Sequence, residues 1–149
     1  MRLAHPLPRR ALHRSAFIAL LSLAGLFASE ANGKTTHFVT AFCSGGGQLC
    51  NDIKTFTVNV PNGATGGADF RPGPLTCSDV RIHFFVDGVE KALTGFVGPG
   101  GDTGFVSLGF VSQGKHTIGV QAEGEVGGCN AGTLGSWAGT VTTMKLEAP

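Results

Sequence analysis

Apolar and polar residues alternate with a period of two along most of the chain after residue 33. The alternation is most regular over residues 55–60, 80–87 and 115–122. Because successive side chains of a β-strand point to opposite faces, each of these segments would bury one face and leave the other in water. The residues predicted to face the core are Phe56, Val58, Val60, Val80, Ile82, Phe84, Val86, His116, Ile118, Val120 and Ala122.

Four further segments have the composition of strands, namely residues 37–43, 90–97, 104–110 and 137–146. Turn-forming residues separate the segments at 61–63, 66–67, 72–74, 87–88, 98–102 and 113–114. Asp87-Gly88 lies between two apolar runs, which is typical of a two-residue β-hairpin. Seven to eight short strands at this spacing predict an all-β fold, an antiparallel β-sandwich of Ig-like or jelly-roll type.

The first 33 residues follow a different pattern. Four arginines precede an apolar run at residues 16–28, and small residues follow the run. This is the pattern of a secretory signal peptide, because the run is shorter than the roughly 20 residues that span a membrane. Cleavage is predicted after Ala31 or after Gly33, and Arg9-Arg10 leaves the twin-arginine route as an alternative to general secretion. We therefore predict a secreted, periplasmic or cell-surface protein in which residues 34–149 form one domain.

Removal of the leader changes the charge balance. The full chain has 11 basic and 10 acidic residues, and the leader contains four arginines and one glutamate, which leaves 7 basic and 9 acidic residues. A domain with a net charge near −2 and no basic cluster lacks a surface that binds phosphates, so nucleic acid is excluded as a partner. No second apolar segment of membrane length follows, so no membrane span is expected after signal removal.

The four cysteines, Cys43, Cys50, Cys77 and Cys129, are even in number, as expected for disulfides in an oxidising compartment. Of the three pairings, we favour Cys43–Cys50, which closes the glycine-rich loop 44–49, together with Cys77–Cys129 across the domain. A zinc site built from all four thiolates is the alternative. Their spacing does not match the short C-x-x-C pairs of zinc ribbons, so disulfides are preferred.

Three short motifs resemble those of bacterial Ig-like domains. They are Val80-Arg-Ile-His-Phe-Phe-Val-Asp-Gly88, Gly101-Asp-Thr-Gly-Phe-Val106 and Gly114-Lys-His-Thr-Ile-Gly-Val-Gln-Ala122. The resemblance covers residues 79–123 and implies an Ig-like sandwich that serves as a non-catalytic module in adhesion, recognition or surface architecture. The chain departs from that family in its four cysteines and in standing as a single unit.

Four residues are candidates for ligand contact. Trp137 is the sole tryptophan and the chain has no tyrosine, so it is the one residue of the type that most often stacks on sugars. A core position packed on a disulfide is the preferred interpretation of Trp137. Arg81, His83 and Phe85 share the polar face of one predicted strand. Phe85 is the exception among the nine phenylalanines after the leader, most of which are predicted to lie in the core.

Candidates for catalysis are weak. Asp79, Asp87, Glu90 and Glu123 could supply a carboxylate pair for glycoside hydrolysis, but acids are common beside turns such as Asp87-Gly88. Ser136 lies in Gly-Ser-Trp-Ala-Gly, which is not the G-x-S-x-G motif of esterases, and is predicted to be a turn residue. No catalytic residue is therefore predicted.

No cofactor is predicted, and the candidates for metal binding are equally weak. Asp102 and Asp69 are predicted in separate glycine-rich loops where calcium could bind, but each loop has a single acid, so turn roles are favoured. His37 could be a copper ligand only if cleavage exposed it as the first residue. His116 is predicted to face inward or to serve a turn, and His83 to lie on a solvated face.

These observations predict a non-enzymatic binding or surface-interaction module with a glycan or protein ligand. The first alternative is a self-associating structural subunit, since the 24 glycines suit chains that stack edge to edge. A small secreted hydrolase is the second alternative. Concentration-dependent assembly would distinguish the self-associating subunit from a monomeric binding module.

Overall fold

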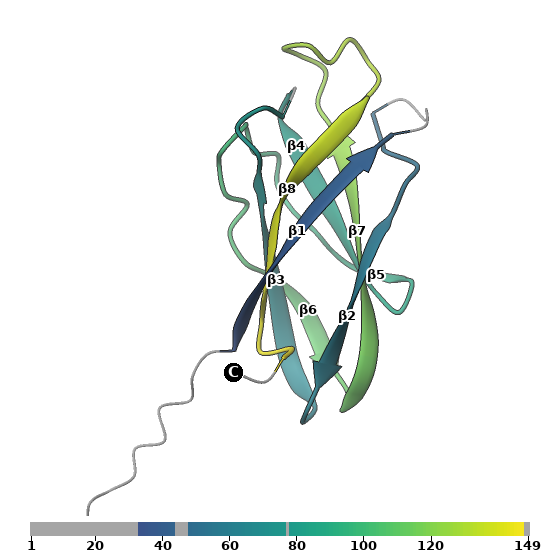
Figure 1. The fold of residues 1–149 in the computed structure, drawn as a ribbon, viewed down its shortest axis with the longest axis vertical. Helices are drawn as coiled ribbons and strands as arrows, with labels where there is room; N and C mark the ends of the chain where they lie inside the picture. Colours follow the sequence, from purple (N-terminus) through teal and green to yellow (C-terminus); the bar gives the residue numbers. More distant parts are fainter. Residues whose placement is uncertain (1–32, 44–47, 77, 148–149) are drawn as a thin grey trace, which may run out of the picture.

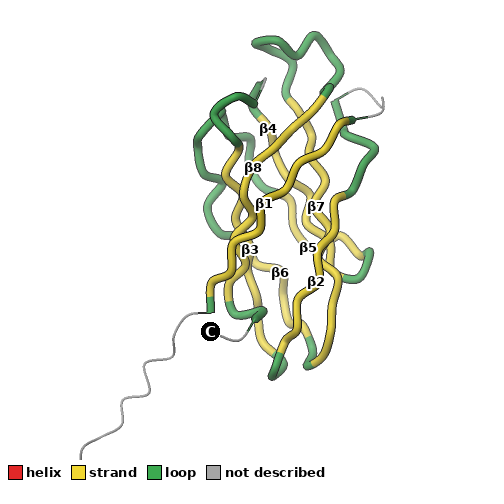
Figure 2. The backbone as a smooth tube through the Cα atoms, viewed as in Figure 1, coloured by secondary structure: helices red, strands yellow, loops and turns green. Residues whose placement is uncertain are grey.

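The computed structural model describes residues 33–43, 48–76 and 78–147, and within these it contains eight strands and no helix (Figures 1 and 2). The strands are β1 (Lys34–Phe42), β2 (Lys54–Val60), β3 (Ala64–Pro72), β4 (Val80–Val86), β5 (Val89–Leu93), β6 (Val106–Val111), β7 (Gly114–Gly124) and β8 (Ser136–Met144). This confirms the predicted all-β class.

The strands form two four-stranded antiparallel sheets that pack face to face. Sheet A has the order β1-β8-β3-β6, and sheet B has the order β2-β7-β4-β5. The pairs β1–β8, β2–β7, β3–β6 and β4–β5 are nested, as if one long hairpin centred on the β4–β5 turn were rolled up. Of the two sandwich types that the sequence leaves open, this nesting is the jelly-roll.

The core lies between the inner faces of the two sheets. Sheet B contributes Val58, Ile82, Phe84, Ile118 and Val120, all at most 1% exposed, in the alternating positions that the sequence predicts. The β4–β5 hairpin turns at Asp87 and Gly88, both with positive φ, as a two-residue turn between twisted strands requires. The strongly periodic segments thus form the expected elements.

The sequence pattern does not predict β3. The prediction of a turn at Gly66-Gly67 is wrong, because these residues lie inside β3, at a register shift against β6. The Gly66 backbone lies directly beneath the Leu146 side chain, and a β-carbon at Gly66 would collide with it. Glycine therefore permits close approach inside a strand here, and small residues leave no hydrophobic pattern to detect.

Other predicted boundaries shift by a few residues. The predicted strand 90–97 ends as β5 at Leu93, and Val97 forms only an isolated bridge with Val80. The predicted strands 104–110 and 137–146 correspond to β6 and β8, and their bounds differ by no more than two residues at each end. The ends of a strand depend on how far it pairs with its neighbours in the sheet. The local sequence pattern carries no information about that pairing.

The Cys43–Cys50 disulfide is present, as predicted, and joins the end of β1 to the segment that leads into β2. Cys129 is also disulfide-bonded, whereas its predicted partner Cys77 lies outside the described residues. The bond uses the sulfurs of Cys43 and Cys50, so the alternative of a four-cysteine zinc site is wrong. In the described ranges no helix is long and apolar enough to cross a membrane. The predicted leader falls outside those ranges, except for Gly33.

Candidate functional site

The structure brings three of the four predicted ligand-contact residues together. Arg81, His83 and Phe85 project from β4 onto the outer face of sheet B, where β7 and β5 flank them. Trp137 lies on β8 in the other sheet. The predicted set therefore divides between two parts of the molecule.

A charged network, here called the Arg81 network, occupies the outer face of sheet B. Arg81 donates two hydrogen bonds to Glu123, from Nε to Oε2 at 2.8 Å and from Nη2 to Oε1 at 2.9 Å. The ring of His83 lies between two carboxylates, with Nε2 3.1 Å from Glu123 and Nδ1 2.9 Å from Glu90. The Arg81 guanidinium also covers the ring of Phe96 at 4.7 Å. Every member of the network therefore has a partner within it.

The electrostatics of the Arg81 network oppose acid catalysis. Hydrogen bonds from Arg81, followed by those from His83, lower the pKa of Glu123 below its ordinary value. The same contact with Glu123 raises the pKa of Arg81. A general acid for glycoside hydrolysis needs a raised pKa, so Glu123 has the opposite adjustment. Of the four acids considered for a hydrolase, only Glu90 and Glu123 contact the same side chain.

Phe85 lies on the outer face of sheet B, as its position in the sequence predicts, and it is half-buried there. Its side chain packs against the Gly119 backbone of β7, where a β-carbon would lie 3.1 Å from both Phe85 and Ile53. Together with Thr55 and Asp87 these residues line a shallow hollow. The glycine thus lets an aromatic ring cover the sheet without an opposing side chain.

Trp137 occupies the core rather than the surface. It is 2% exposed, and its ring packs edge-on against Phe70 with centroids 5.8 Å apart. This position matches the preferred interpretation of Trp137 as a core residue. A ring enclosed between two sheets offers no face on which a sugar could stack.

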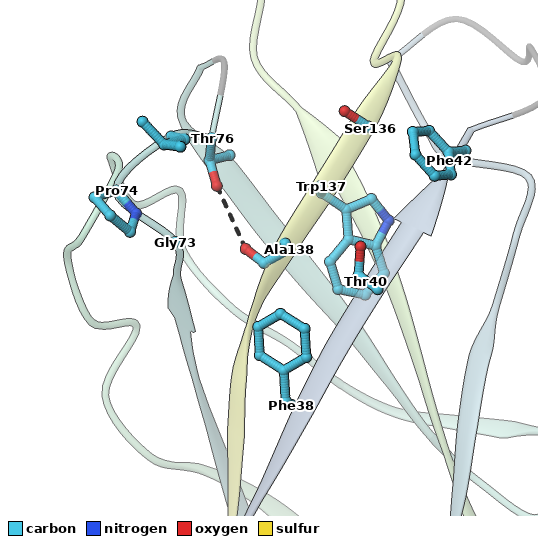
Figure 3. Close-up of a pocket in the computed structure, with 10 residues that line it drawn as sticks. Phe38, Thr40, Phe42, Gly73, Pro74, Thr76, Ser136, Trp137 and Ala138 are labelled. Carbon is cyan, nitrogen blue, oxygen red and sulfur yellow. Dashed lines mark hydrogen bonds between the residues drawn. The ribbon is translucent and has the colours of Figure 1, made fainter.

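An apolar groove crosses the outer face of sheet A and is here called the Phe38 groove (Figure 3). Its apolar surface comes from Phe38 and Phe42 of β1, which are 73% and 83% exposed, and from Leu75 in the β3–β4 loop, which is 96% exposed. The groove encloses about 330 Å³. Large apolar side chains gathered on a surface in this way mark interaction sites.

Polar groups line the same groove. Thr40, Thr76 and Ser136 contribute hydroxyls, and Thr76 donates a hydrogen bond from Oγ1 to the carbonyl oxygen of Ala138 at 3.4 Å. Gly73 donates its backbone N–H to the same carbonyl at 2.8 Å, which ties the β3–β4 loop to β8. These bonds fix the wall of the groove against its floor. None of the described residues that line the groove is charged.

The sequence pattern does not predict this groove, because it places most phenylalanines in the core. That prediction is wrong for Phe38, Phe42 and Phe110, which are all at least 70% exposed, and also for Phe96 and Phe105, which are 39% and 40% exposed. A usable signal was present in β1. Phe38 and Phe42 alternate with Val39 and Ala41 and share their strand face with threonines. Since both faces of this strand carry apolar residues, the number of apolar residues alone could not identify the buried face.

The acids considered for calcium come closer together than the sequence predicts. Asp69 lies in β3 rather than in a loop, so that part of the prediction is wrong. Burial, and then the nearby charge of Asp102, raises the pKa of Asp69. Asp102 itself bonds to Arg71 at 2.7 Å and has a lowered pKa. No group of three or more potential metal ligands occurs in the described part of the chain.

The remaining histidines have structural partners. His116 bonds through Nδ1 to Oδ2 of Asp87 at 2.7 Å, and so joins β7 to the β4–β5 turn, as its predicted turn role requires. His83 has a side chain only 15% exposed, so its predicted solvated face is largely covered by its neighbours. His37 lies within β1 and stacks on Phe56 with centroids 3.9 Å apart.

No protein-family model and no curated protein matches the chain. Solved structures that are similar to it include a family 35 carbohydrate-binding module from Clostridium thermocellum, at 16% identity and a TM-score of 0.44, which covers 74% of this chain and 90% of that one. Another is the CBM36-1 domain of a multidomain xylanase from the hindgut metagenome of Trinervitermes trinervoides, at 12% identity and 0.41, covering 73% and 96%. At these scores the comparison assigns neither a family nor a ligand to the chain.

Proposed function

We propose that this protein is a non-catalytic binding module that holds a neutral carbohydrate in the Phe38 groove. The observation that carries the proposal is the convergence of exposed phenylalanine rings and neutral hydroxyls on one shallow surface. Trp137, the residue type expected in this role, is buried beneath the same strands.

The groove has the two kinds of surface that a sugar ring requires. The C–H faces of a sugar are apolar and pack on aromatic rings, which Phe38 and Phe42 supply. Sugar hydroxyls need hydrogen-bond partners beside that platform, which Thr40 and Ser136 supply. Because the described lining contains no charged side chain, we expect uncharged sugars rather than uronic or sialic acids.

Two further observations support a binding module outside the cytoplasm. The Cys43–Cys50 disulfide fits an oxidising compartment, as the predicted signal peptide requires. Arg81 lowers the pKa of the candidate acid Glu123, which disfavours a general-acid role for this residue in glycoside hydrolysis. Binding without catalysis is therefore the function that best fits both outer faces.

The test is a glycan-array screen of the oxidised protein. We expect binding to neutral glycans that Phe38→Ala removes, because the platform for the sugar ring is lost. Phe110→Ala is the matched control, since Phe110 is 70% exposed on the same sheet but lies outside the groove. No hits with folded protein, or equal loss in both variants, would overturn the proposal.

A further inference from the structure

We propose that a second copy of this chain pairs with β1 along its open edge, antiparallel and centred on Phe38, so that two four-stranded A sheets join into one sheet of eight strands. The pairing uses the backbone edge of β1, although the side chains of Phe38 and Thr40 also line the Phe38 groove. It does not require a bound carbohydrate.

Half of the backbone N–H and C=O groups of β1 have no backbone partner among the described residues. Cys43 donates its N–H to Gly135, and Lys145 donates to the carbonyl of Gly33. In an antiparallel ladder alternate residues face the partner strand, so the odd-numbered residues of β1 bond to β8. The even-numbered residues, Thr36, Phe38 and Thr40 among them, therefore point their N–H and C=O groups away from β8. Within the described segments no backbone hydrogen bond satisfies these groups.

The other three sheet edges carry devices that discourage pairing. β5 has five residues, includes Glu90 and Lys91, and lies against a register shift in β4. β6 is interrupted by Gly109, which has a φ of 74°, and by a shift in its pairing with β3. β2 begins at Lys54 and is followed directly by Pro61. Charges, bulges and prolines are the usual means by which proteins protect edge strands.

β1 lacks these devices. It has nine residues without proline, glycine or a register shift, and its one charged residue is Lys34 at its start. Its outer face carries the highly exposed Phe38 and Phe42. A long, regular and partly apolar edge is the type that pairs with another strand.

The sequence of β1 fits a second copy of itself. A two-fold axis at Phe38 uses all nine residues and places even-numbered residues opposite even-numbered residues, so that their free N–H and C=O groups can bond. Phe38 then lies beside Phe38 of the other copy, and Thr36 lies opposite Thr40. The two Lys34 side chains lie at opposite ends of the pair, so the like charges stay apart. Two-fold pairing of this kind closes after two copies.

The test uses the oxidised protein in sedimentation equilibrium, from about 1 µM to about 1 mM, the range of weak to moderate affinities. We expect the mass to rise from one to two chains as concentration increases. Thr40→Pro is expected to abolish the dimer, because it removes an N–H that points away from β8 and leaves the β1–β8 ladder intact. Its circular dichroism spectrum and melting temperature report whether the variant is folded.

A charge-exchange pair of variants tests the register. In the proposed dimer residue 36 lies opposite residue 40 of the other copy. Within a single copy of β1, the Cα atoms of residues 36 and 40 lie about 13 Å apart, so their side chains do not interact directly. Thr36→Lys with Thr40→Lys should weaken the dimer about tenfold, since two pairs of like charges meet. Thr36→Lys with Thr40→Glu, which keeps both substitution sites, should dimerise at least as well as the unmodified chain.

Two results would overturn the proposal. The first is a protein that stays monomeric over the whole concentration range. The second is a dimer that a folded Thr40→Pro variant retains, or whose affinity is the same in both charge variants. Glycan binding by a monomer would leave the proposed function standing, and a dimer without glycan binding would leave this proposal standing, so the two failures are distinguishable.

Discussion

The two outer faces of this sandwich satisfy their side chains in opposite ways. On sheet B, Arg81, Glu123, His83 and Glu90 bond to one another, and Arg81 covers Phe96. On sheet A, Phe38 and Phe42 lie in water beside neutral hydroxyls. A ligand would gain little binding free energy on sheet B, because each new hydrogen bond to the protein would replace an existing one. Binding at the exposed apolar face of sheet A should release more free energy, because it removes apolar surface from water.

Trp137→Ala tests the part of sheet A that lies beneath the Phe38 groove. We expect a loss of about 3–5 kcal/mol in unfolding free energy, because a large buried ring is removed. Urea denaturation measures it. Phe42→Ala is the comparison on the neighbouring strand, where the ring is 83% exposed. A small loss for Trp137→Ala would contradict its core position.

Arg81→Ala tests whether the network on sheet B is self-contained. We expect a clear decrease in thermal stability, because Glu123, with a side chain 20% exposed, loses the two hydrogen bonds from Arg81 and keeps only its contact with His83. Arg71→Ala removes a similar partner from Asp102, but both side chains of that pair are at least 42% exposed, so its effect should be smaller. Calorimetry compares the two. Glycan binding should be unchanged in both.

Phe38→Ser combined with Phe42→Ser tests whether the rings of sheet A contribute to folding. We expect the unfolding free energy to change by no more than about 0.5 kcal/mol, because both side chains are exposed. Chemical denaturation measures this, and binding is measured on the same sample. A large loss of stability would mean that the rings serve the fold rather than a ligand.

The contact between His116 and Asp87 should give a small pH dependence. The Asp87 carboxylate raises the pKa of His116, so its stabilising effect is complete below the unfolded value of 6.5 and is lost as pH rises through the folded pKa. The lowered pKa of Asp87 keeps that carboxylate ionised until the pH falls below its ordinary value of 3.8.

The measurement is the melting temperature of the unmodified chain and of His116→Gln against pH. The difference between them should be largest between pH 3.8 and pH 6.5, and it should shrink as the pH rises past 6.5 and through the raised pKa of folded His116. A difference that stays constant over this range would show that protonation of His116 does not stabilise the turn.

The strands that the sequence predicts best are those that bury one complete face. β4 alternates without exception between buried and half-buried positions, and β7 departs from alternation in its buried part only at Gly119; both strands lie at the centre of sheet B. β3 is also central but was missed, since Gly66, Gly67 and Ala68 achieve burial by close packing rather than by bulk. An alternating pattern arises where large apolar side chains are buried on one face of a strand. It cannot reveal a strand such as β3, whose buried residues are small and whose backbone is covered by other parts of the chain.

The candidate site was predictable only in part. Arg81, His83 and Phe85 share a face because they alternate along one strand, and that arrangement follows from local sequence. The Phe38 groove joins β1, β8 and the loop after β3, which are far apart in the chain. Sheet order brings them together, and sheet order depends on tertiary pairing.

The nesting of the strand pairs also has a consequence for the order of folding. Among the four nested pairs, β4 and β5 are joined by the shortest loop. Once this hairpin forms, β3 and β6 can meet at a reduced entropic cost, and then β2 and β7. β1 and β8 are the first and last of the described strands, so β1 can pair only after β8 has been synthesised. We therefore expect β1 to spend the longest time without a partner, so that its edge should govern how readily the newly made chain aggregates.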